Sequence, residues 1–258
     1  LRDSLPELTD EEFQAYAHRH FPAYWLKVDL ERKRKHAELL FRAARSGEML
    51  LTDTQTNAFR GVTELTVLAI DHPRLLAIIT GACAAAGANI VEAQIFTTTD
   101  GLALDTIFIS RAFQQDEDEL RRAERVARHI VQTLKGEIRL PEAIAIREAS
   151  RDRQNAFSLA PDVVLDNALS DKNTVIEVTG LDRPGLLYDL TTVIGKMNLN
   201  INSARIVTFG EKAVDVFYVT DLTGGKLLQV PRQQALKRSL LDVFETPDAP
   251  GAQTSAKT

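Results

Sequence analysis

The chain has 258 residues, of which 44% are hydrophobic, so it can form one large domain or two small ones. A net charge of −5 argues against a nucleic-acid-binding protein, because such proteins normally present a basic surface. The single cysteine, Cys83, rules out a disulfide within the chain, and no apolar run approaches the roughly 20 residues of a membrane span. We therefore expect a protein of the reducing cytoplasm, and because the sequence opens on Leu1 rather than Met, we expect it to be part of a longer chain.

The first 47 residues are predicted to be helical. Thr9 followed by Glu12 is a capping box, which begins a helix expected to end near residue 20. Residues 21–26 are expected to be an aromatic connector, and Asp29 is placed to cap a second helix that Gly47 ends. Three histidines of this segment lack a carboxylate-rich partner motif, so we interpret them as surface or capping residues rather than metal ligands: His18, His20 and His36.

From residue 49 onwards the sequence pattern changes to strands that alternate with helices. Apolar and β-branched runs predict strands, Asp-Gly at 100–101 predicts a hairpin, and Gly87 and Gly136 predict helix ends. The expected elements are a short strand at 49–52, a strand at 63–70, a turn at 71–76 that leads into a helix, strands at 89–99 and 102–110, and an amphipathic helix from about 116 to 136.

Residues 174–208 repeat this order and contain the clearest turn of the chain. Gly180 and Gly185 indicate that a strand ends here in a turn. Pro184 suits the first position of a helix, and Asp182 is placed to accept from the N–H groups of the first turn. Such a helix start leaves backbone donors and a positive dipole end, and Gly185 has no side chain to keep a ligand away. The turn is either a docking point for a small anionic or zwitterionic molecule or a plain connection between a strand and a helix.

The two stretches are copies of one unit. Asp71 and Asp182 are 182 − 71 = 111 residues apart, and at this offset twelve of the thirty-five positions from 63 to 97 are identical. After the hairpin the match continues one residue shorter, with Asp105 against Asp215. A change of one residue is typical of a hairpin tip, so it supports the strand assignment and predicts two βαββα units.

Three further segments complete the predicted organisation. Residues 141–160 are the expected linker, 230–244 the closing helix of the second unit, and 246–258 a disordered tail. The second unit lacks a closing strand downstream, so we expect residues 163–166 to pair antiparallel with the strand at 174–181. Residues 49–52 would serve the first unit in the same way.

Two motifs carry a resemblance to a known family. LDRPGLLYDLT at 181–191 closely resembles the turn motif of ACT domains, which are ferredoxin-like regulatory modules that bind small molecules, and IDHPRLLAIIT at 70–80 resembles it more loosely. The resemblance implies an α+β fold with two ferredoxin-like ACT domains, each a βαββα unit with a preceding edge strand. The domains would span 48–140 and 161–245, after a short helical segment at 1–47.

The tandem and the helical segment before it resemble the C-terminal region of the bacterial PII uridylyltransferase family, whose members both transfer and remove uridylyl groups. In that family a nucleotidyltransferase domain and a metal-dependent HD phosphohydrolase domain precede two ACT domains that are taken to sense glutamine. The resemblance therefore implies L-glutamine as the ligand, the PII nitrogen-signalling protein as a partner, and upstream catalytic domains that use Mg²⁺. Residues 1–47 would be the tail of the HD region.

The chain itself lacks the residues of either reaction. It has no Gly-Ser turn followed by paired aspartates and no adjacent His-Asp pair, so we expect no catalytic residue, no metal site and no uridylyl transfer or removal by this chain alone. Two alternatives remain open. One is an ACT tandem that stands alone or is attached to other domains. The other is an RNA-binding module in which Phe217 and Tyr218 stack on bases.

The predicted ligand-binding residues follow the motif in both copies. In the second copy they are Asp182, Arg183, Pro184, Gly185, Leu186, Leu187, Asn200 and Ile201, and in the first copy Asp71, His72, Arg74, Leu75, Asn89 and Ile90. We expect the second copy to form the better site, because Arg74 stands where Gly185 leaves the backbone open. Gly185→Arg should therefore weaken binding more than Arg74→Gly.

A further expectation concerns the faces of the sheets. The strand at 213–220 carries Val214, Val216 and Tyr218 on one face and Phe217 and Val219 on the other. An uncovered apolar face would favour aggregation, so we expect the sheets to be paired or otherwise covered, within the chain or in a homodimer.

Overall fold

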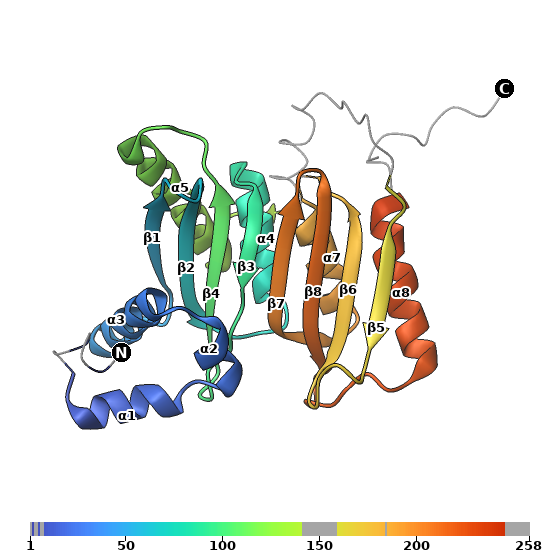
Figure 1. Cartoon of the computed structure of the whole chain (residues 1–258), viewed down its shortest axis with the longest axis horizontal. Helices are drawn as coiled ribbons and strands as arrows, with labels where there is room; N and C mark the ends of the chain where they lie inside the picture. The colour runs from blue at the N-terminus through green and yellow to red at the C-terminus, as the bar shows by residue number, and fades with distance from the viewer. Residues whose placement is uncertain (1, 3–4, 6–7, 141–158, 184, 246–258) are drawn as a thin grey trace.

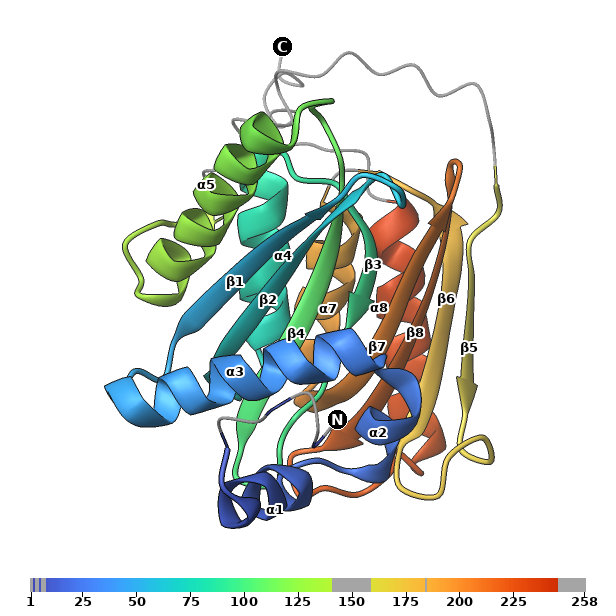
Figure 2. The same cartoon turned by 60° about the vertical axis from the view of Figure 1, so that its left-hand side comes forward.

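The structure is a computed structural model that describes residues 2, 5, 8–140, 159–183 and 185–245. Most of the predicted linker, the predicted tail and Pro184 lie outside these residues. The described residues form one eight-stranded antiparallel sheet with helices on both faces (Figures 1 and 2), so the predicted α+β class is confirmed.

Each repeat supplies four adjacent strands of this sheet. The order is β1 (Leu51–Asn57), β2 (Val62–Ile70), β4 (Leu102–Ser110) and β3 (Ile90–Gln94) from the first repeat, then β7 (Leu199–Phe209), β8 (Lys212–Asp221), β6 (Thr174–Leu181) and β5 (Asp162–Asp166) from the second. The predicted edge strands are confirmed, since β1 pairs antiparallel with β2 and β5 with β6. Strand β1 begins and ends later than the predicted 49–52. The prediction was short because the polar residues of this half-buried strand show no apolar alternation.

Four helices cover one face of the sheet. They are α4 (Leu75–Ala86), α5 (Asp116–Leu134), α7 (Leu186–Lys196) and α8 (Val230–Glu245), and Figure 2 shows α4, α7 and α8 behind the strands. Their apolar faces form a single core with the strands, which runs through both repeats from Leu65 and Ile107 to Phe217 and Leu240. Because this core is continuous, the two repeats pack as one unit.

The N-terminal helices cover the opposite face of the sheet over the first repeat (Figure 1). They are α1 (Asp10–His18), α2 (Pro22–Lys27) and α3 (Leu30–Ser46). The predicted capping box at Thr9 and the predicted stop at Gly47 are confirmed. The predicted connector at 21–26 joins α1 to α3 and includes a short helix, which begins at Pro22, where the missing N–H of proline costs nothing.

A buried polar network joins these N-terminal helices to the sheet. The hydroxyl oxygens of Tyr16 and Tyr24 lie 2.7 Å apart, and the Tyr24 hydroxyl lies 3.1 Å from Nδ1 of His36. Nε2 of His36 lies 3.0 Å from Oγ1 of Thr106 in β4. The surface or capping interpretation is therefore wrong for His36 and His20, which are 1% and 7% exposed. His36 is buried because both of its ring nitrogens find partners.

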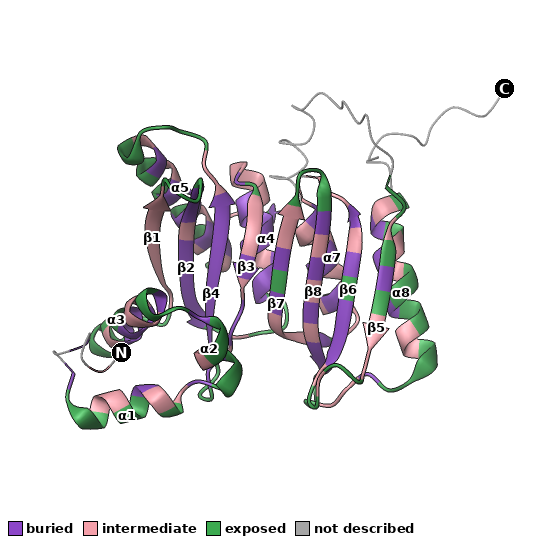
Figure 3. Ribbon diagram, in the orientation of Figure 1, coloured by how far each residue is buried: buried purple, intermediate pink, exposed green. Residues whose placement is uncertain are grey.

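The second repeat is more open on this face (Figure 3). Val164 is 48% exposed, and Val216 and Tyr218 are half-buried. Lys27 of α2 lies 4.8 Å from the centre of the Tyr218 ring, so the N-terminal segment reaches the border of this surface. The expectation that the apolar face is covered within the chain is confirmed for the first repeat. Cover of the second repeat by a homodimer stays a prediction.

The burial of His36 makes stability depend on pH. Burial lowers the pKa of its imidazole from 6.5 to about 3. Between these values the unfolded chain binds a proton that the folded chain does not, so this stability is full above pH 6.5 and is lost as the pH falls. We expect the unmodified chain to lose about 2 kcal/mol from this source between about pH 7 and pH 5 in urea denaturation, and His36→Gln to lose less.

Tyr16→Phe is the matched control for this substitution, because it removes a hydroxyl group from the same network, and burial raises the pKa of that hydroxyl above its usual value, far from the range of about pH 5 to pH 7. It should lower the free energy of unfolding by a similar amount at both pH values. Burial also lowers the pKa of His20, to about 4, so the acid loss should be reduced in His36→Gln rather than abolished. An acid loss that is the same in His36→Gln and in the unmodified chain would contradict this account.

Gly81 of α4 marks the close approach of the two repeats. A Cβ atom at Gly81 would lie 2.7 Å from Cδ1 of Leu140 and 2.7 Å from Cδ2 of Tyr188 in α7. Gly81→Ala should therefore lower the free energy of unfolding by about 1–3 kcal/mol, despite the better helix propensity of alanine. Gly195→Ala is the control, because a Cβ atom there would come no closer than 3.4 Å to a neighbour and should add up to about 1 kcal/mol. Equal effects of the two substitutions on chemical denaturation would count against a tight contact at Gly81.

Candidate ligand-binding sites between the two repeats

Strands β3 and β7 join the two repeats edge to edge. Their register pairs Ala93 with Ile206 and Gln94 with Arg205. Gln94 and Arg205 are equivalent positions of the two repeats, because 94 + 111 = 205. An antiparallel pair of equivalent strands that is centred on equivalent residues relates the two repeats by a pseudo-two-fold axis.

The helices that cover these strands meet at the same axis. Thr80 of α4 and Thr191 of α7 are also equivalent, since 80 + 111 = 191, and their hydroxyl oxygens lie 3.3 Å apart. Gly81 lets α4 approach Tyr188 of α7 closely. As a result, the start of α7 lies beside the end of α4, and the start of α4 lies beside the end of α7.

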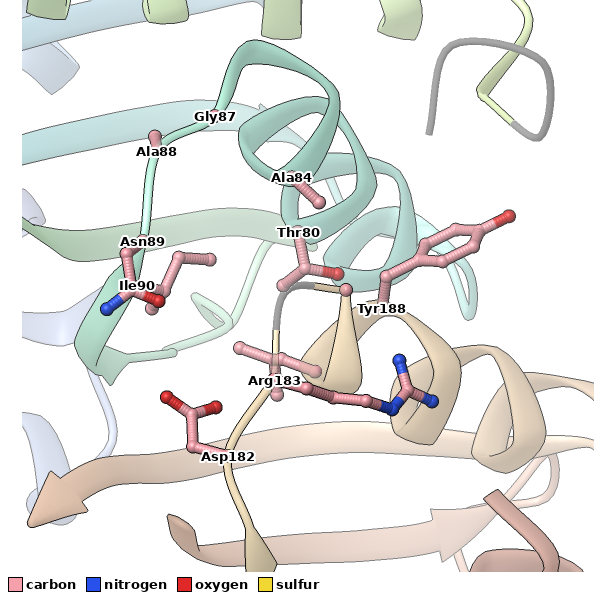
Figure 4. A pocket seen from close by; sticks show the side chains of 11 residues that line it. Thr80, Ala84, Gly87, Ala88, Asn89, Ile90, Asp182, Arg183 and Tyr188 are labelled. Atoms are coloured by element: carbon pink, nitrogen blue, oxygen red, sulfur yellow. The ribbon is translucent and has the colours of Figure 1, made fainter. Parts of the chain in front are cut away.

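A first cavity, which we call the β6–α7 cavity, lies where the turn of the second repeat meets the end of α4. The first repeat contributes Thr80, Ala84, Gly87, Ala88, Asn89 and Ile90 to its lining, and the second contributes Asp182, Arg183, Gly185, Leu187 and Tyr188. Figure 4 shows the carboxylate of Asp182 directed towards Asn89 and Ile90 of the other repeat. This cavity is therefore built by both repeats.

A second cavity, which we call the β2–α4 cavity, has the corresponding composition on the other side of the axis. The first repeat contributes Asp71, His72, Pro73, Leu75, Leu76, Ile95 and Asp105 to its lining, and the second contributes Asn200 and Ile201. Asn200 and Ile201 are equivalent to Asn89 and Ile90, because 89 + 111 = 200 and 90 + 111 = 201. Each cavity thus combines the turn of one repeat with the Asn-Ile pair of the other.

This crossing changes how the predicted site residues combine. We predicted that Asp182 and its neighbours act together with Asn200 and Ile201 of the same repeat, but these two residues line the other cavity. The pairing of β3 with β7 is the physical reason, because it turns the strand start of each repeat towards the turn of its neighbour. Of the other predicted residues, Leu186 is buried in the core, Arg74 is not among the lining residues of either cavity, and Pro184 lies outside the described residues.

The turn of the β6–α7 cavity is capped differently from the prediction. Helix α7 begins at Leu186, and Gly185 is its N-cap with a φ of 80°, in the left-handed region that glycine adopts without strain. The described residues place no side-chain cap on α7, so Asp182 does not cap it and faces the cavity instead. The N–H of Leu186 donates to the carbonyl oxygen of Arg183 at 3.1 Å, so a backbone donor offered to a ligand comes from later in the first turn. Gly185→Arg would strain this turn as well as fill it, which makes that substitution an ambiguous probe of binding.

Arg183 is held away from Asp182 by its own contacts. Its guanidinium donates to Oδ2 of Asp189 at 2.6 Å and to the carbonyl oxygen of Val243 at 3.3 Å. Figure 4 shows the guanidinium pointing away from the carboxylate of Asp182. Asp182 is therefore not neutralised by a direct ion pair with its neighbour in the chain.

In the turn of the β2–α4 cavity the aspartate side chain is bonded by a threonine. Oγ1 of Thr97 donates to Oδ2 of Asp71 at 2.9 Å, and the backbone N–H of Asp71 donates to the carbonyl oxygen of Gly101 at 3.0 Å. Arg74 is the N-cap of α4, and its Cγ lies 3.6 Å from the place that a Cβ atom at Gly195 would take. The side chain of Arg74 therefore packs along α7 of the other repeat.

One pair of equivalent buried aspartates was not predicted from the sequence. Asp105 of β4 lines the β2–α4 cavity, and Asp215 holds the equivalent position in β8. They are 1% and 2% exposed. Burial raises the pKa of both carboxyl groups, to about 8 for Asp215, and the neighbouring Asp71 and Asp182 raise them further. The signal was present in the sequence, because each aspartate interrupts an apolar strand at the same position of the repeat.

Together, the groups of each cavity complement a small zwitterion. The helix start offers backbone N–H groups and a positive dipole end to a carboxylate. The aspartates can accept from an ammonium group, and the asparagine amide can both donate and accept. Across the part of the chain that the structure describes, no group of three or more His, Cys, Asp or Glu side chains is placed to hold a metal ion. No helix of that part is long and apolar enough to cross a membrane.

Two families of ACT domains match the chain, one in each repeat. The ACT domain family matches residues 63–129, and the family described as the ACR family N-terminal ACT domain matches residues 169–244. The crystal structure of aspartate kinase from Synechocystis is similar with a TM-score of 0.39 and 16% identity, over 72% of this chain and 27% of that chain.

Curated relatives match nearly the whole chain. The bifunctional uridylyltransferase/uridylyl-removing enzyme of Rhodopseudomonas palustris is 54% identical over 96% of this chain, and that of Nitrobacter winogradskyi is 56% identical over 95%. This chain covers only 27% and 26% of those two proteins. The chain therefore contains two ACT domains in tandem, within a sequence closely similar to one part of the bifunctional uridylyltransferase/uridylyl-removing enzymes.

Proposed function

We propose that this chain is the glutamine-sensing region of a bifunctional uridylyltransferase/uridylyl-removing enzyme. The observation that carries the proposal is the pair of cavities, each of which joins a helix start and an aspartate of one repeat to an asparagine of the other. The parent enzyme is supported by relatives of that name that are 54% and 56% identical over nearly the whole chain.

L-Glutamine offers one partner to each of these groups. In the β6–α7 cavity its carboxylate fits the N–H groups at the start of α7, and its ammonium group fits Asp182. Its side-chain amide fits the amide of Asn89, which comes from the other repeat. In the β2–α4 cavity Asp71 and Asn200 would take the corresponding roles.

Binding of this kind would depend on the contact between the repeats and would stabilise it. A ligand that touches both repeats stabilises the paired arrangement of β3 and β7 over any arrangement in which they separate.

The chemistry would be carried out upstream, by nucleotidyltransferase and HD domains that use Mg²⁺ and act on the PII protein in the cytoplasm. This chain would perform neither uridylyl transfer nor uridylyl removal. A homodimer would cover the open face of the second repeat.

The alternatives from the sequence differ in how they fit the structure. An ACT tandem attached to other domains would use the same cavities, so it differs only in what the ligand regulates. An RNA-binding module needs exposed aromatic rings on which bases stack. Phe217 is 0% exposed, and the ring of Tyr218 already has Lys27 above it at 4.8 Å. The aromatic pair that motivated this alternative therefore offers no stacking platform.

Calorimetric titration with L-glutamine tests the proposal together with the crossing of the repeats. We expect two binding events in the unmodified chain. Asp182→Ala should weaken one of them by about ten- to a hundred-fold, which is the usual effect of losing a hydrogen bond to a charged group. Asn89→Ala should weaken the same event by about two- to ten-fold, because the lost bond is between neutral groups. Asn200→Ala should weaken the other event.

Double variants give the sharpest comparison. Asp182→Ala combined with Asn89→Ala should leave one event intact, whereas Asp182→Ala combined with Asn200→Ala should weaken both. The reverse pattern would mean that each site is built within one repeat. An unmodified chain that gives no heat with glutamine would exclude glutamine as its ligand.

A further inference from the structure

The buried carboxyl groups of Asp105 and Asp215 lie beside Asp71 and Asp182, respectively. We propose that each of them shares the ammonium group of the amino acid with its neighbouring aspartate, and that ligand binding releases a proton from it. This rests on the proposed amino-acid sensing, to which it adds a requirement for a free α-amino group and a response to pH.

The position of Asp105 is the first argument. It lies on the helix-covered face of β4, between Ala103 and Ile107 of the apolar core, and it lines the β2–α4 cavity. It is 1% exposed, and its Oδ1 has no hydrogen-bond partner in the described part of the chain. Burial of an unpaired polar atom lowers stability, and an apolar side chain would serve the core better. A ligand that enters the cavity and donates a hydrogen bond to this oxygen would therefore explain the carboxyl group.

The second repeat carries an equivalent buried aspartate, Asp215, which lies beside Asp182 of the β6–α7 cavity rather than among the residues that line it. Asp215 is 2% exposed, and its Oδ1 also lacks a partner among the described residues. A backbone N–H bonds each carboxyl group, from Phe96 for Asp105 and from Val207 for Asp215. These two donors are equivalent, because 96 + 111 = 207. An unpaired buried oxygen thus occurs at the same place in both repeats, which a packing accident in one repeat does not explain.

The surroundings of Asp105 favour a cationic ligand. The turn presents Asp71 and His72, β7 presents the uncharged Asn200 and Ile201, and the titratable side chain of α4 is Cys83. On α5, Glu119 is bound by Arg122 at 2.7 Å beside Ser110, His129 is half-buried, and the other charged groups are exposed or half-buried. Among the described residues that line this cavity there are two carboxyl groups and no lysine or arginine.

The surroundings of Asp215 differ from those of Asp105 in one cation, because Arg183 lines the β6–α7 cavity. The turn presents Asp182 and Arg183, and Arg183 binds Asp189 of α7 at 2.6 Å. Lys196 of α7 is exposed. The charged residues of α8 are exposed except Arg232, which is half-buried and donates to the carbonyl oxygen of Met197 at 2.9 Å. An arriving ammonium group would therefore meet carboxyl groups that form no direct ion pair with a described residue, since the ion pair of Arg183 is with Asp189.

The proton balance of this binding step is simple. Without ligand, burial and the second carboxylate keep the pKa of Asp105 well above its usual range and raise that of Asp215 to about 8, so near pH 7 the carboxyl groups hold their protons. The ammonium group keeps its three protons and pairs with a carboxylate, so the carboxylic acid gives one proton to the solvent. Affinity should therefore rise with pH, by up to about tenfold per unit below the pKa of the site, and level off above it.

The test is a titration of the full chain with L-glutamine near pH 7 in two buffers, phosphate and Tris, whose ionisation enthalpies differ. We expect the heats to differ in proportion to the protons released, up to about one for each site. Asp105→Asn combined with Asp215→Asn should abolish this difference and weaken binding about ten- to a hundred-fold. The amide has nearly the same shape as the carboxyl group, so this variant should fold, and its thermal unfolding checks that it does.

Two controls separate the aspartates from other sources of protons. Glu177→Gln changes an exposed carboxylate of β6 and should leave proton release as it is in the unmodified chain. Glutaramic acid, which is glutamine without its α-amino group, should bind weakly, without proton release, and equally to the unmodified chain and to the double variant. In both controls the ligand keeps the carboxylate and the side-chain amide of glutamine.

The outcomes distinguish this inference from the function on which it rests. Glutamine binding with equal heats in both buffers, or with full affinity in the double variant, would overturn the role of the aspartates and leave the sensing function standing. If glutamine does not bind, the proposed ligand is wrong, and the other common L-amino acids are titrated in the same way. Proton-releasing binding of any of them then supports the role of the aspartates, whereas binding without release, or no binding at all, overturns it.

Discussion

The antiparallel pairing of β3 with β7 is the contact on which the rest of this structure depends. Each repeat alone would leave one of these strands as an open edge of its sheet, and the pairing satisfies both edges at once. Because the register is centred on Gln94 and Arg205, it places the repeats around one axis and brings α4 against α7. The two cavities follow from this arrangement, since each needs a turn from one repeat and a strand start from the other.

Strand β4 connects the first-repeat cavity to the N-terminal helices. Asp105 and Thr106 are neighbours on β4 and face opposite sides of the sheet, so one lines the cavity and the other contacts His36 of α3. The hairpin that precedes β4 also touches this segment, because Arg19 pairs with Asp100 at 3.2 Å. Asp71 is bonded to the same hairpin through the carbonyl oxygen of Gly101. A movement of β4 or Asp71 would therefore act directly on contacts of the segment that precedes the two repeats.

Much of the fold was predictable because its signals are local. The capping box at Thr9, the left-handed stop at Gly47 and the repeat at an offset of 111 each depend on residues close together or on a match of whole segments. The predicted site residues were located within their turns by the same signals. Their combination was not predictable, because the pairing of Asp182 with Asn89 depends on which strand edges meet, and that is set by the packing of the whole sheet. His36 and Asp105 were missed for a related reason, since a polar residue on an apolar face is interpreted correctly only when its partners across the fold are known.

A crystal structure of this chain with L-glutamine tests the central claim most directly. The account predicts ligand density in a cavity between the repeats, with contacts to Asp182 and Asn89, or to Asp71, Asp105 and Asn200, so that both repeats touch one ligand molecule. Density whose contacts are confined to one repeat, such as Asp182 with Asn200, would contradict it.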